Sequence, residues 1–511
     1  NYNARIPIML FNKIAVSLML ATCSVFAAAP LTIWIMPNGA SPQEKLEQRL
    51  KIFTQKTGIP TSIQVLDWGE AWNRIAGALS TGEKAPDILQ LGTTWVPYFA
   101  SRGEIKPLNS WISSIDSTRF VPVSWNTSHI DADTTIYSIP WFIDIRPVLA
   151  NKKILRKYNI SKESLVNYED FIAAIRKVNN AREILDDGQK VSGFAFPGKS
   201  DWNIPHNFAP WIWSNGGDFI VKDSSGHWHS SILTENTLRG IAKYLYFILD
   251  KLVPTERLQN NTAQVAQSFN NGELAFIVNT AEIVMQTRFH GAQGGLSNAR
   301  IGADSVMVIP IPKGDNGSIS FIGGSNLAIP QKNKRPEAID LLLFLTSDEN
   351  LNEYTRQIGF LPTSKKVLDF WAQDEDYKEL VKALEYGRTY STIPEWGDIE
   401  QSLVGMFTEV WEQLEIPAFY SEAKLYEIFK KYTQKMDEQL GYKADSQMTL
   451  EEFQKIWNRA LKDASVKKAD VKTEEVVQKE SPLVSQIRFA PILFCIVVFI
   501  AFGVSYKRKR K

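Results

Sequence analysis

The sequence LTIWIMPNG (Leu31–Gly39) opens the stretch that decides the fold, and this stretch continues to Gly92. Along it, short β-rich runs alternate with segments whose apolar residues recur at helical spacing. The β-rich runs are LTIWIM (Leu31–Met36), TSIQVLD (Thr61–Asp67) and DILQLG (Asp87–Gly92), and the helical segments are SPQEKLEQRLKIFTQKTG (Ser41–Gly58) and EAWNRIAGALSTG (Glu70–Gly82). This β-α-β-α-β order predicts an α/β fold with a parallel sheet and helices on both of its faces.

The first helical segment carries its own start and stop signals. Ser41 is a suitable N-cap, Pro42 suits the first helical position, and Gly58 suits the end of the helix. These signals predict a helix bounded by Ser41 and Gly58.

The carboxyl ends of the three predicted strands are candidate ligand loops, because open parallel sheets bind ligands beyond those ends. The loops are Pro37-Asn38-Gly39, Asp67-Trp68-Gly69-Glu70 and Gly92-Thr93-Thr94-Trp95. Each of them presents polar or aromatic side chains at the place where a ligand would be met.

A second α/β pattern follows, from about residue 147 to residue 300. It contains a helical segment near Tyr168–Asn179, the strand GFAF (Gly193–Phe196), the helix TLRGIAKYLYFILD (Thr237–Asp250) and the strand LAFIVN (Leu274–Asn279). Further strands are predicted at SVMVIPIP (Ser305–Pro312) and NLAIP (Asn326–Pro330), and helices follow. Two α/β units of this size predict two lobes with a cleft between them.

Composition excludes several classes of function. The formal net charge is +1, whereas nucleic-acid binding needs a basic face, so we expect no nucleic-acid partner. The two cysteines, Cys23 and Cys495, lie in apolar segments near the ends, so the central chain has no disulfide or thiolate metal site to offer. His227 and His229 lack a third ligand nearby, and we expect neither a metal nor a cofactor.

The N-terminal residues 1–29 have the pattern of a secretory signal peptide. Lys13 precedes the apolar run Ile14–Thr22, and small residues follow near Ala27. The start of translation is predicted at Met9. Lipidation at Cys23 is a second interpretation, although Thr22 is a poor residue directly before a lipidated cysteine.

The C-terminal segment Phe489–Tyr506 carries no charge and is followed by the basic tail 507–511. Its length approaches the thickness of a hydrocarbon core, and the basic residues favour the cytoplasmic side. These features predict an exported protein that a C-terminal transmembrane helix anchors to the cytoplasmic membrane, with a polar linker at 463–488 and the bulk in the periplasm or outside.

Several segments in a fixed order resemble the extracellular solute-binding proteins of sugar-type ABC importers, the maltose-binding-protein-like group. These segments are LTIWIMPNG, GEKAPDILQLGTTW (Gly82–Trp95), IYSIPWFIDIRPVLANKKIL (Ile136–Leu155), FNNGELAF (Phe269–Phe276), FIGGSNLAIP (Phe321–Pro330), GFLPTSKKV (Gly359–Val367) and TIPEWGDIE (Thr392–Glu400). The resemblance covers about residues 30–460.

The resemblance implies a two-lobe periplasmic-binding-protein fold of type II over residues 30–462. The first lobe would hold about 30–143 and 305–358, the second about 147–302 and 360–462, with a hinge at DIRPVLAN (Asp144–Asn151). Lobes of this kind close around a ligand when ligand contacts favour the closed form. The implied function is to bind a sugar or oligosaccharide outside the membrane and to deliver it to ABC permease subunits that work with a separate ATPase.

The resemblance also implies where a carbohydrate would be met, since sugars offer C–H faces to aromatic rings and hydroxyls to polar groups. The candidate ligand-binding residues are Asn38, Trp68, Glu70, Trp95, Trp141, Asp144, Arg146, Trp211, Trp213, Gly216, Gly217, Asn279, Gly324, Ser325, Tyr390 and Trp396.

Simpler roles compete with several of these assignments. Asn38 can be a turn residue, Glu70 can stabilise a helix N-terminus, and Trp95 can pack under its helix. Asp144 and Arg146 can pair with each other, and Trp211 and Trp213 cannot both face one side of a helix.

The segment RTYSTIPEWGDIEQSL (Arg388–Leu403) is predicted to present Trp396, and with it Tyr390, to the cleft as a stacking platform. The helix that follows is predicted to begin with Asp398 as its N-cap.

Two other functions remain open at this point. An enzyme would need a carboxyl pair such as Asp144 and Glu395 at about 5–9.5 Å, and no catalytic motif accompanies those residues, so we expect no enzymatic activity. A membrane-anchored carbohydrate-sensing or surface-binding protein would present its ligand to a separate signalling partner.

Overall fold

The computed structural model describes residues 29–39, 41–199, 201–287, 301, 305–443 and 448–466. The predicted signal peptide with its start at Met9, most of the linker, the transmembrane segment Phe489–Tyr506 and the basic tail lie outside these residues. Within the described ranges, no helix is both long and apolar enough to span a membrane. The described residues up to Ser465 belong to one structural unit.

The first lobe is built on a seven-stranded sheet in the order β12-β4-β11-β3-β1-β2, with β13 paired to β11. Its strands are β1 (Leu31–Ile35), β2 (Thr61–Val65), β3 (Ile88–Gly92), β4 (Ile139–Arg146), β11 (Ser320–Ala328), β12 (Leu361–Pro362) and β13 (Gly387–Arg388). β1 pairs in parallel with both β2 and β3, as predicted. β11 is antiparallel to β3 and to β4.

Helices cover both faces of this sheet, which confirms the prediction from alternation. Ile33 and Ile35 point into a core that includes Leu50 of α2 (Pro42–Thr57). Trp34, between them, faces the opposite core, which includes Ile75 of α3 (Trp68–Thr81). Successive side chains of a strand point to opposite faces, so one buried strand serves both cores. The other helices of this lobe are α4 (Val96–Ser101), α5 (Pro122–Trp125), α12 (Glu337–Leu345) and α13 (Asp348–Ile358).

The end signals of α2 are confirmed in part. Pro42 occupies the first turn, and Gly58 closes the helix at φ 75°, a conformation that glycine adopts without a Cβ penalty. The prediction that Ser41 caps the helix is wrong, because its backbone is left-handed at φ 52° and its side chain makes no capping hydrogen bond.

The second lobe contains a four-stranded sheet in the order β10-β5-β9-β6. The strands are β5 (Val148–Asn151), β6 (Ser192–Phe194), β9 (Leu274–Val278) and β10 (Val306–Ile309), and a separate hairpin is formed by β7 (Ile220–Lys222) and β8 (Trp228–Ser230). Its helices are α6 (Lys152–Lys157), α7 (Tyr168–Ala181), α8 (Ile204–Ser214), α9 (Glu235–Leu249), α10 (Thr262–Asn270) and α11 (Glu282–Gln286). The strands β6, β9 and β10 and the helices α7 and α9 match predicted elements, although β10 was expected in the first lobe.

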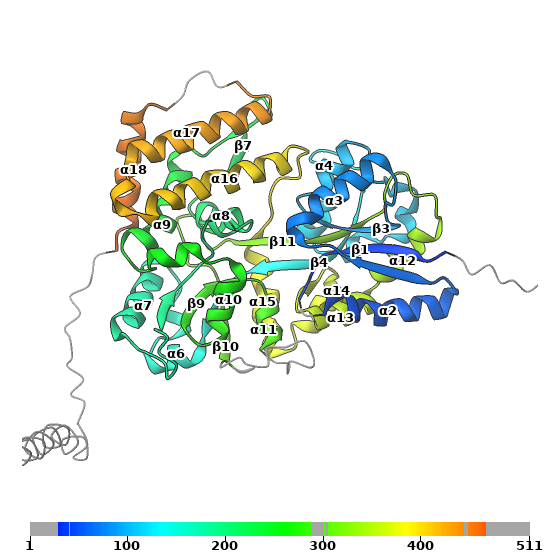
Figure 1. Ribbon diagram of the computed structural model, residues 1–511, viewed down its shortest axis with the longest axis horizontal. Helices are drawn as coiled ribbons and strands as arrows, with labels where there is room; N and C mark the ends of the chain where they lie inside the picture. Colours follow the sequence, from blue (N-terminus) through cyan, green and yellow to red (C-terminus); the bar gives the residue numbers. More distant parts are fainter. Residues whose placement is uncertain are drawn as a thin grey trace, which may run out of the picture. The chain divides into compact units, whose positions relative to one another are not determined.

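The segment DIRPVLAN joins the two sheets directly. Its first residues end β4 in the first lobe, and after Pro147 the chain continues as β5 in the second. β10 likewise pairs with β5, whereas β11 returns to the first sheet beside β4. Figure 1 shows β4 and β11 side by side where the lobes meet.

The chain from 360 onward is shared between the lobes, although we expected it in the second lobe alone. β12 pairs with β4 and β13 with β11 in the first sheet. Two helices, α14 (Lys365–Trp371) and α15 (Glu375–Ala383), follow β12, and then α16 (Trp396–Glu415), α17 (Glu422–Gln439) and α18 (Leu450–Ala464) complete the described chain. α16 packs on α8 of the second lobe and also contacts α4 of the first (Figure 1).

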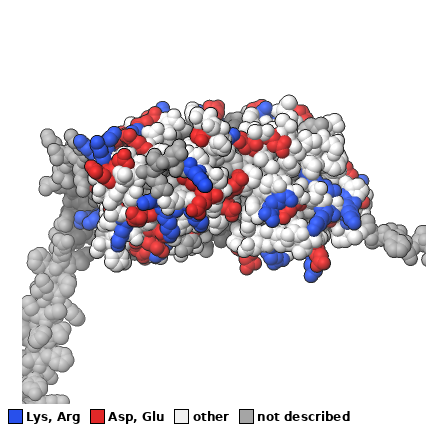
Figure 2. All heavy atoms as spheres, turned by 90° about the horizontal axis from the view of Figure 1, so that it is seen from above, with Lys and Arg blue, Asp and Glu red and all other residues white. Residues whose placement is uncertain are grey.

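Charged side chains of both signs are interspersed over the face seen in Figure 2. This mixed surface agrees with the near-zero net charge.

Candidate functional site

Two tryptophans from opposite lobes stack on each other. Trp68 is the first residue of α3, and Trp202 lies in the turn before α8. Their ring centroids are 5.8 Å apart and the rings are inclined by 19°. The Trp68 indole N–H donates to the carbonyl of Pro37 at 2.9 Å, which fixes the ring, and Trp202 is 50% exposed.

Further aromatic rings support Trp68 on the first lobe. Trp95 meets Trp68 edge-on with 5.6 Å between centroids, and it meets Trp72 at 5.3 Å. A Cβ on Gly397 of α16 would lie 3.0 Å from the Trp72 ring, so a side chain there would require the ring to shift by a few tenths of an ångström. Trp95 therefore packs against neighbouring rings, which is the simpler role considered for it, and it also lies beside the Trp68 ring.

Arg146 is the polar centre of this region. It forms an ion pair with Asp144 at 2.8 Å and donates to the side chain of Asn203 at 2.7 Å. Arg146 is therefore held by its own strand on one side and by the turn that carries Trp202 on the other. The second carboxylate oxygen of Asp144, Oδ1, is buried and accepts no hydrogen bond from the described part of the chain.

A buried histidine continues the polar network. His206 on α8 shares a 2.8 Å hydrogen bond between Nδ1 and the hydroxyl of Tyr390, and its Nε2 lies 3.5 Å from Oε1 of Glu400. The other oxygen of Glu400 accepts from the hydroxyl of Thr94 at 3.3 Å. Because Thr94 belongs to the loop after β3, this network also reaches across the lobes.

Burial shifts the acidity of these groups. It raises the pKa of Glu400 to about 7, against smaller opposing effects of the Thr94 hydrogen bond and Arg146. It also lowers the pKa of His206 well below its usual value, with Arg146 adding to the effect. Glu282, the first residue of α11, has its pKa raised to about 7 by burial and by Asp144. At neutral pH the His206 ring is therefore uncharged, and the carboxyls of Glu400 and Glu282 are partly protonated.

Trp396 does not have the exposed position predicted for it. Its side chain is 1% exposed and is stacked on Tyr390 with 4.4 Å between centroids. Tyr390 is in turn covered by His206 and by Phe321. A ring face already covered by protein cannot stack a ligand, so Trp396 lies in a supporting layer. The helix N-cap is Glu395 rather than Asp398, which lies in the first turn of α16.

The loop after β1 is structural. Asn38 is 2% exposed and exchanges two hydrogen bonds with Gln90, at 2.9 and 3.0 Å. Gln90 also donates to Ser325 at 2.8 Å. Gly324, next to it, has φ 141°, and an added Cβ would lie 2.2 Å from a carbonyl oxygen of β4. Strand packing therefore explains Asn38, Gly324 and Ser325 without a ligand.

Three of the predicted tryptophans are also buried. Trp141 stacks on Tyr354 in the first core, with 4.8 Å between centroids. Trp211 stacks on Tyr244 at 5.6 Å, and Trp213 donates to Asp218 at 3.0 Å. All three are at most 2% exposed.

The remaining candidates have local structural roles. Gly217 packs so closely on α9 that a Cβ would lie 2.5 Å from Thr237, and Gly216 supplies the turn with φ 78°. Glu70 is exposed in the first turn of α3, where its charge suits the helix N-terminus. Asn279 is buried and accepts from the next backbone N–H.

Sequence reasoning missed Trp202, Asn203, His206 and Glu400. The signal that could have found the first three is DWNIPH (Asp201–His206), in which an aromatic residue sits between two turn-forming residues ahead of a proline-started helix. Glu400 gives no such signal, because an acidic residue inside an amphipathic helix usually faces solvent.

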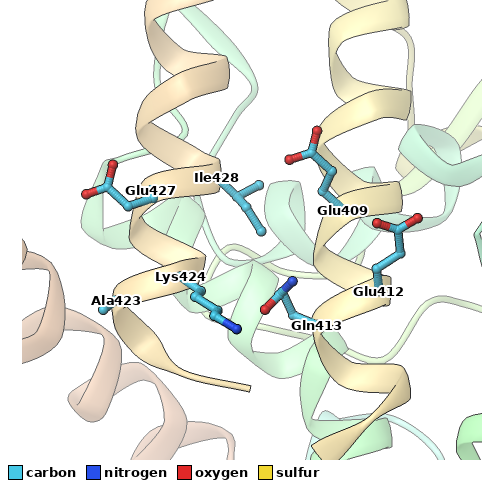
Figure 3. A pocket seen from close by; sticks show the side chains of 7 residues that line it. All are labelled: Glu409, Glu412, Gln413, Ala423, Lys424, Glu427 and Ile428. Carbon is cyan, nitrogen blue, oxygen red and sulfur yellow. The ribbon is translucent and has the colours of Figure 1, made fainter. Parts of the chain in front are cut away.

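A separate hollow of about 500 Å³ lies between α16 and α17 (Figure 3). Its lining includes Glu409, Glu412, Glu427 and Lys424. Glu409 is already engaged by Lys431 at 2.7 Å, and the hollow touches none of the aromatic residues above. No group of three or more potential metal ligands occurs within the described residues. The candidate site is therefore the interlobe cluster, defined as Trp68, Trp95, Asp144, Arg146, Trp202, Asn203, His206, Tyr390 and Glu400.

Comparison with known proteins gives a family for most of the chain. The family described as bacterial extracellular solute-binding protein matches residues 48–384. The diacetylchitobiose-binding protein DasA of Streptomyces coelicolor is 24% identical over 382 residues, which cover 73% of this chain and 83% of DasA. An erythritol/L-threitol-binding protein of Mycolicibacterium smegmatis is 23% identical over 193 residues, covering 35% of this chain and 39% of that protein.

Solved structures confirm the two-lobe fold. Maltose-bound MalE3 of T. maritima superposes with a TM-score of 0.67 at 20% identity, covering 80% of this chain and 99% of that one. The GacH receptor of Streptomyces glaucescens, solved with and without acarbose, gives 0.64 at 18% identity, covering 81% and 100%.

Proposed function

The chain belongs to the family of bacterial extracellular solute-binding proteins, and from this membership we propose that it binds a sugar or oligosaccharide between its two lobes. Members of such a family act outside the cell, so the protein is exported. They are binding proteins rather than enzymes. The proposed ligand agrees with the relatives named above, which bind diacetylchitobiose, maltose and acarbose.

One observation carries the proposal: both lobes contribute an aromatic ring and polar groups to the same interlobe cluster. Trp68 and Trp202 offer the flat apolar surfaces that suit the C–H faces of a sugar. Arg146 and the buried Oδ1 of Asp144 lie close by, and hydroxyls can donate to that oxygen. A ligand that touches both sides favours the closed arrangement of the lobes.

In this proposal the closed protein delivers its ligand to permease subunits of an ABC importer that works with a separate ATPase. The segment Phe489–Tyr506 anchors the chain to the membrane and thereby raises its concentration near those subunits. The site uses the protein's own side chains and requires no cofactor.

A thermal-shift panel tests the carbohydrate assignment. The panel contains maltose, cellobiose, N,N′-diacetylchitobiose, erythritol and, as non-carbohydrate controls, glycine and a dipeptide. A carbohydrate that binds the folded state raises its stability by about 2.7 kcal/mol when present at about a hundred times its Kd. We expect a higher melting temperature with at least one carbohydrate and an unchanged melting temperature with the controls.

The same panel is read by intrinsic tryptophan fluorescence, because Trp68 and Trp202 lie in the cluster. Unchanged melting and unchanged fluorescence with every carbohydrate would contradict the proposal.

A further inference from the structure

The turn that carries Trp202 is held by several hydrogen bonds, although its indole is half exposed. Asp201 accepts from the backbone N–H of Asn203 at 2.8 Å and from that of Thr262 at 2.6 Å. Asn203 donates to the Thr262 hydroxyl at 3.0 Å and accepts from Arg146. Both Asp201 and Asn203 are buried. The buried polar frame therefore holds a half-exposed apolar ring at the lobe boundary, where one of its contacts is with Trp68 of the other lobe.

Trp68 is held just as firmly on the other lobe. Its indole N–H is bonded to Pro37, and Trp95 meets its ring edge-on. The guanidinium of Arg146 lies 6.0 Å from the Trp202 ring, and His206 meets that ring edge-on. Trp68 is thus supported from the first lobe and Trp202 by residues of both lobes, and their nearly parallel faces are turned toward each other.

The distance between these faces shows what has to change for a ligand to enter. The centroid separation of 5.8 Å is that of two rings in contact. A third ring between them needs two contacts of about 3.5–4.0 Å, or roughly 7–8 Å in all. Since the two platforms belong to different lobes, a small hinge motion at β4–β5 provides this separation. The Trp68–Pro37 bond and the Asp201–Thr262 bond each lie within one lobe, so both stay intact during this motion.

We propose that Trp68 and Trp202 clamp one pyranose ring between them, and that this two-sided clamp selects rings of gluco configuration. The inference rests on the proposed function, because it names the class of carbohydrate that the interlobe cluster takes. A pyranose whose ring hydroxyls are all equatorial presents C–H groups on both faces. An axial hydroxyl, as at C4 of galactose, points at one indole, where it loses its hydrogen bonds to water and finds no other hydrogen-bond partner.

Titration of tryptophan fluorescence with methyl β-D-glucopyranoside and methyl β-D-galactopyranoside tests the clamp, because the two probes differ only at C4. The unsatisfied axial hydroxyl predicts that the wild-type protein favours the gluco probe by about tenfold or more. Trp202→Ala leaves an aromatic ring on one side only, so it lowers the affinity for the gluco probe and brings the two affinities within about twofold of each other. Trp202→Phe keeps an apolar face and retains the preference.

Phe370→Ala is the matched control, because Phe370 is 55% exposed and lies on α14, outside the interlobe cluster. It should leave both affinities unchanged. Equal wild-type affinities, no binding of either probe, or a preference that survives Trp202→Ala in protein that melts normally would overturn the clamp. The proposed function is decided separately by the carbohydrate panel, since a panel sugar that binds while the clamp test fails leaves that function standing.

Discussion

Replacing Trp396 by Ala should lower the free energy of unfolding by about 3–5 kcal/mol, the usual cost of truncating a buried aromatic side chain. Trp396 is 1% exposed, and its ring stacks on Tyr390 at the start of α16. Its removal opens a cavity beneath Tyr390, His206 and the rest of the interlobe cluster. Urea unfolding followed by circular dichroism measures the loss.

This result distinguishes a supporting ring from a ligand platform. A platform would lose affinity on substitution while its stability stayed close to that of the wild type. Phe370→Ala serves here as the exposed comparison, and it should change the unfolding free energy by less than about 1 kcal/mol. Wild-type stability of Trp396→Ala combined with lost carbohydrate binding would restore the interpretation drawn from the sequence.

Stability should also fall as the pH rises from about 4.5 to above 7, in part because of Glu400. Burial raises the pKa of this carboxyl to about 7 in the folded protein, from an ordinary value of 4.5. The folded state therefore binds the proton more tightly than the unfolded state, so its advantage is present at low pH and lost as the carboxyl ionises. The slope is up to about 1.4 kcal/mol per pH unit, or about 3 kcal/mol over the window.

Glu400→Gln isolates this contribution from the other titrating groups. The amide cannot ionise, so the difference in unfolding free energy between variant and wild type should grow in favour of the variant from pH 5 to pH 8. The matched control is Glu412→Gln, which changes an exposed glutamate of the same helix. A Glu400→Gln difference that stays constant with pH would show that the carboxyl is not buried between Thr94 and His206.

The sequence was sufficient to predict the architecture because its local signals agree with one another. The alternation between Leu31 and Gly92 predicts the parallel strands and the two covered faces, and Pro42 and Gly58 delimit α2. Ser41 shows the limit of such signals. A capping residue works only when its backbone is extended, and the chain enters α2 in a left-handed turn that removes this option.

The candidate site was predicted less well, because tryptophan has the same chemistry in a core and in a binding site. Trp68, Trp141 and Trp211 all follow plausible patterns in the sequence, yet only Trp68 meets a ring from the other lobe. What separates them is tertiary contact with residues distant in the chain. Trp202 illustrates the converse, since its importance depends on Arg146 and Thr262, which hold the turn around it.

Two glycines predicted to bind the ligand also have packing roles that the sequence does not reveal. Gly324 and Gly217 were predicted among the ligand-binding residues, but β4 and α9 already occupy the space that a Cβ would need. Absence of a side chain permits close approach, and the sequence does not say whether the approaching group belongs to a ligand or to the protein.

Hydrogen–deuterium exchange with and without the carbohydrate that gives the largest thermal shift tests binding between the lobes most directly. We expect slower exchange on ligand addition in the segments around Trp68, around Trp202 and His206, and around Tyr390 to Glu400. Little change is expected around the hollow lined by Glu412 and Glu427. Protection confined to one lobe, or centred on the α16–α17 hollow, would contradict binding between the lobes.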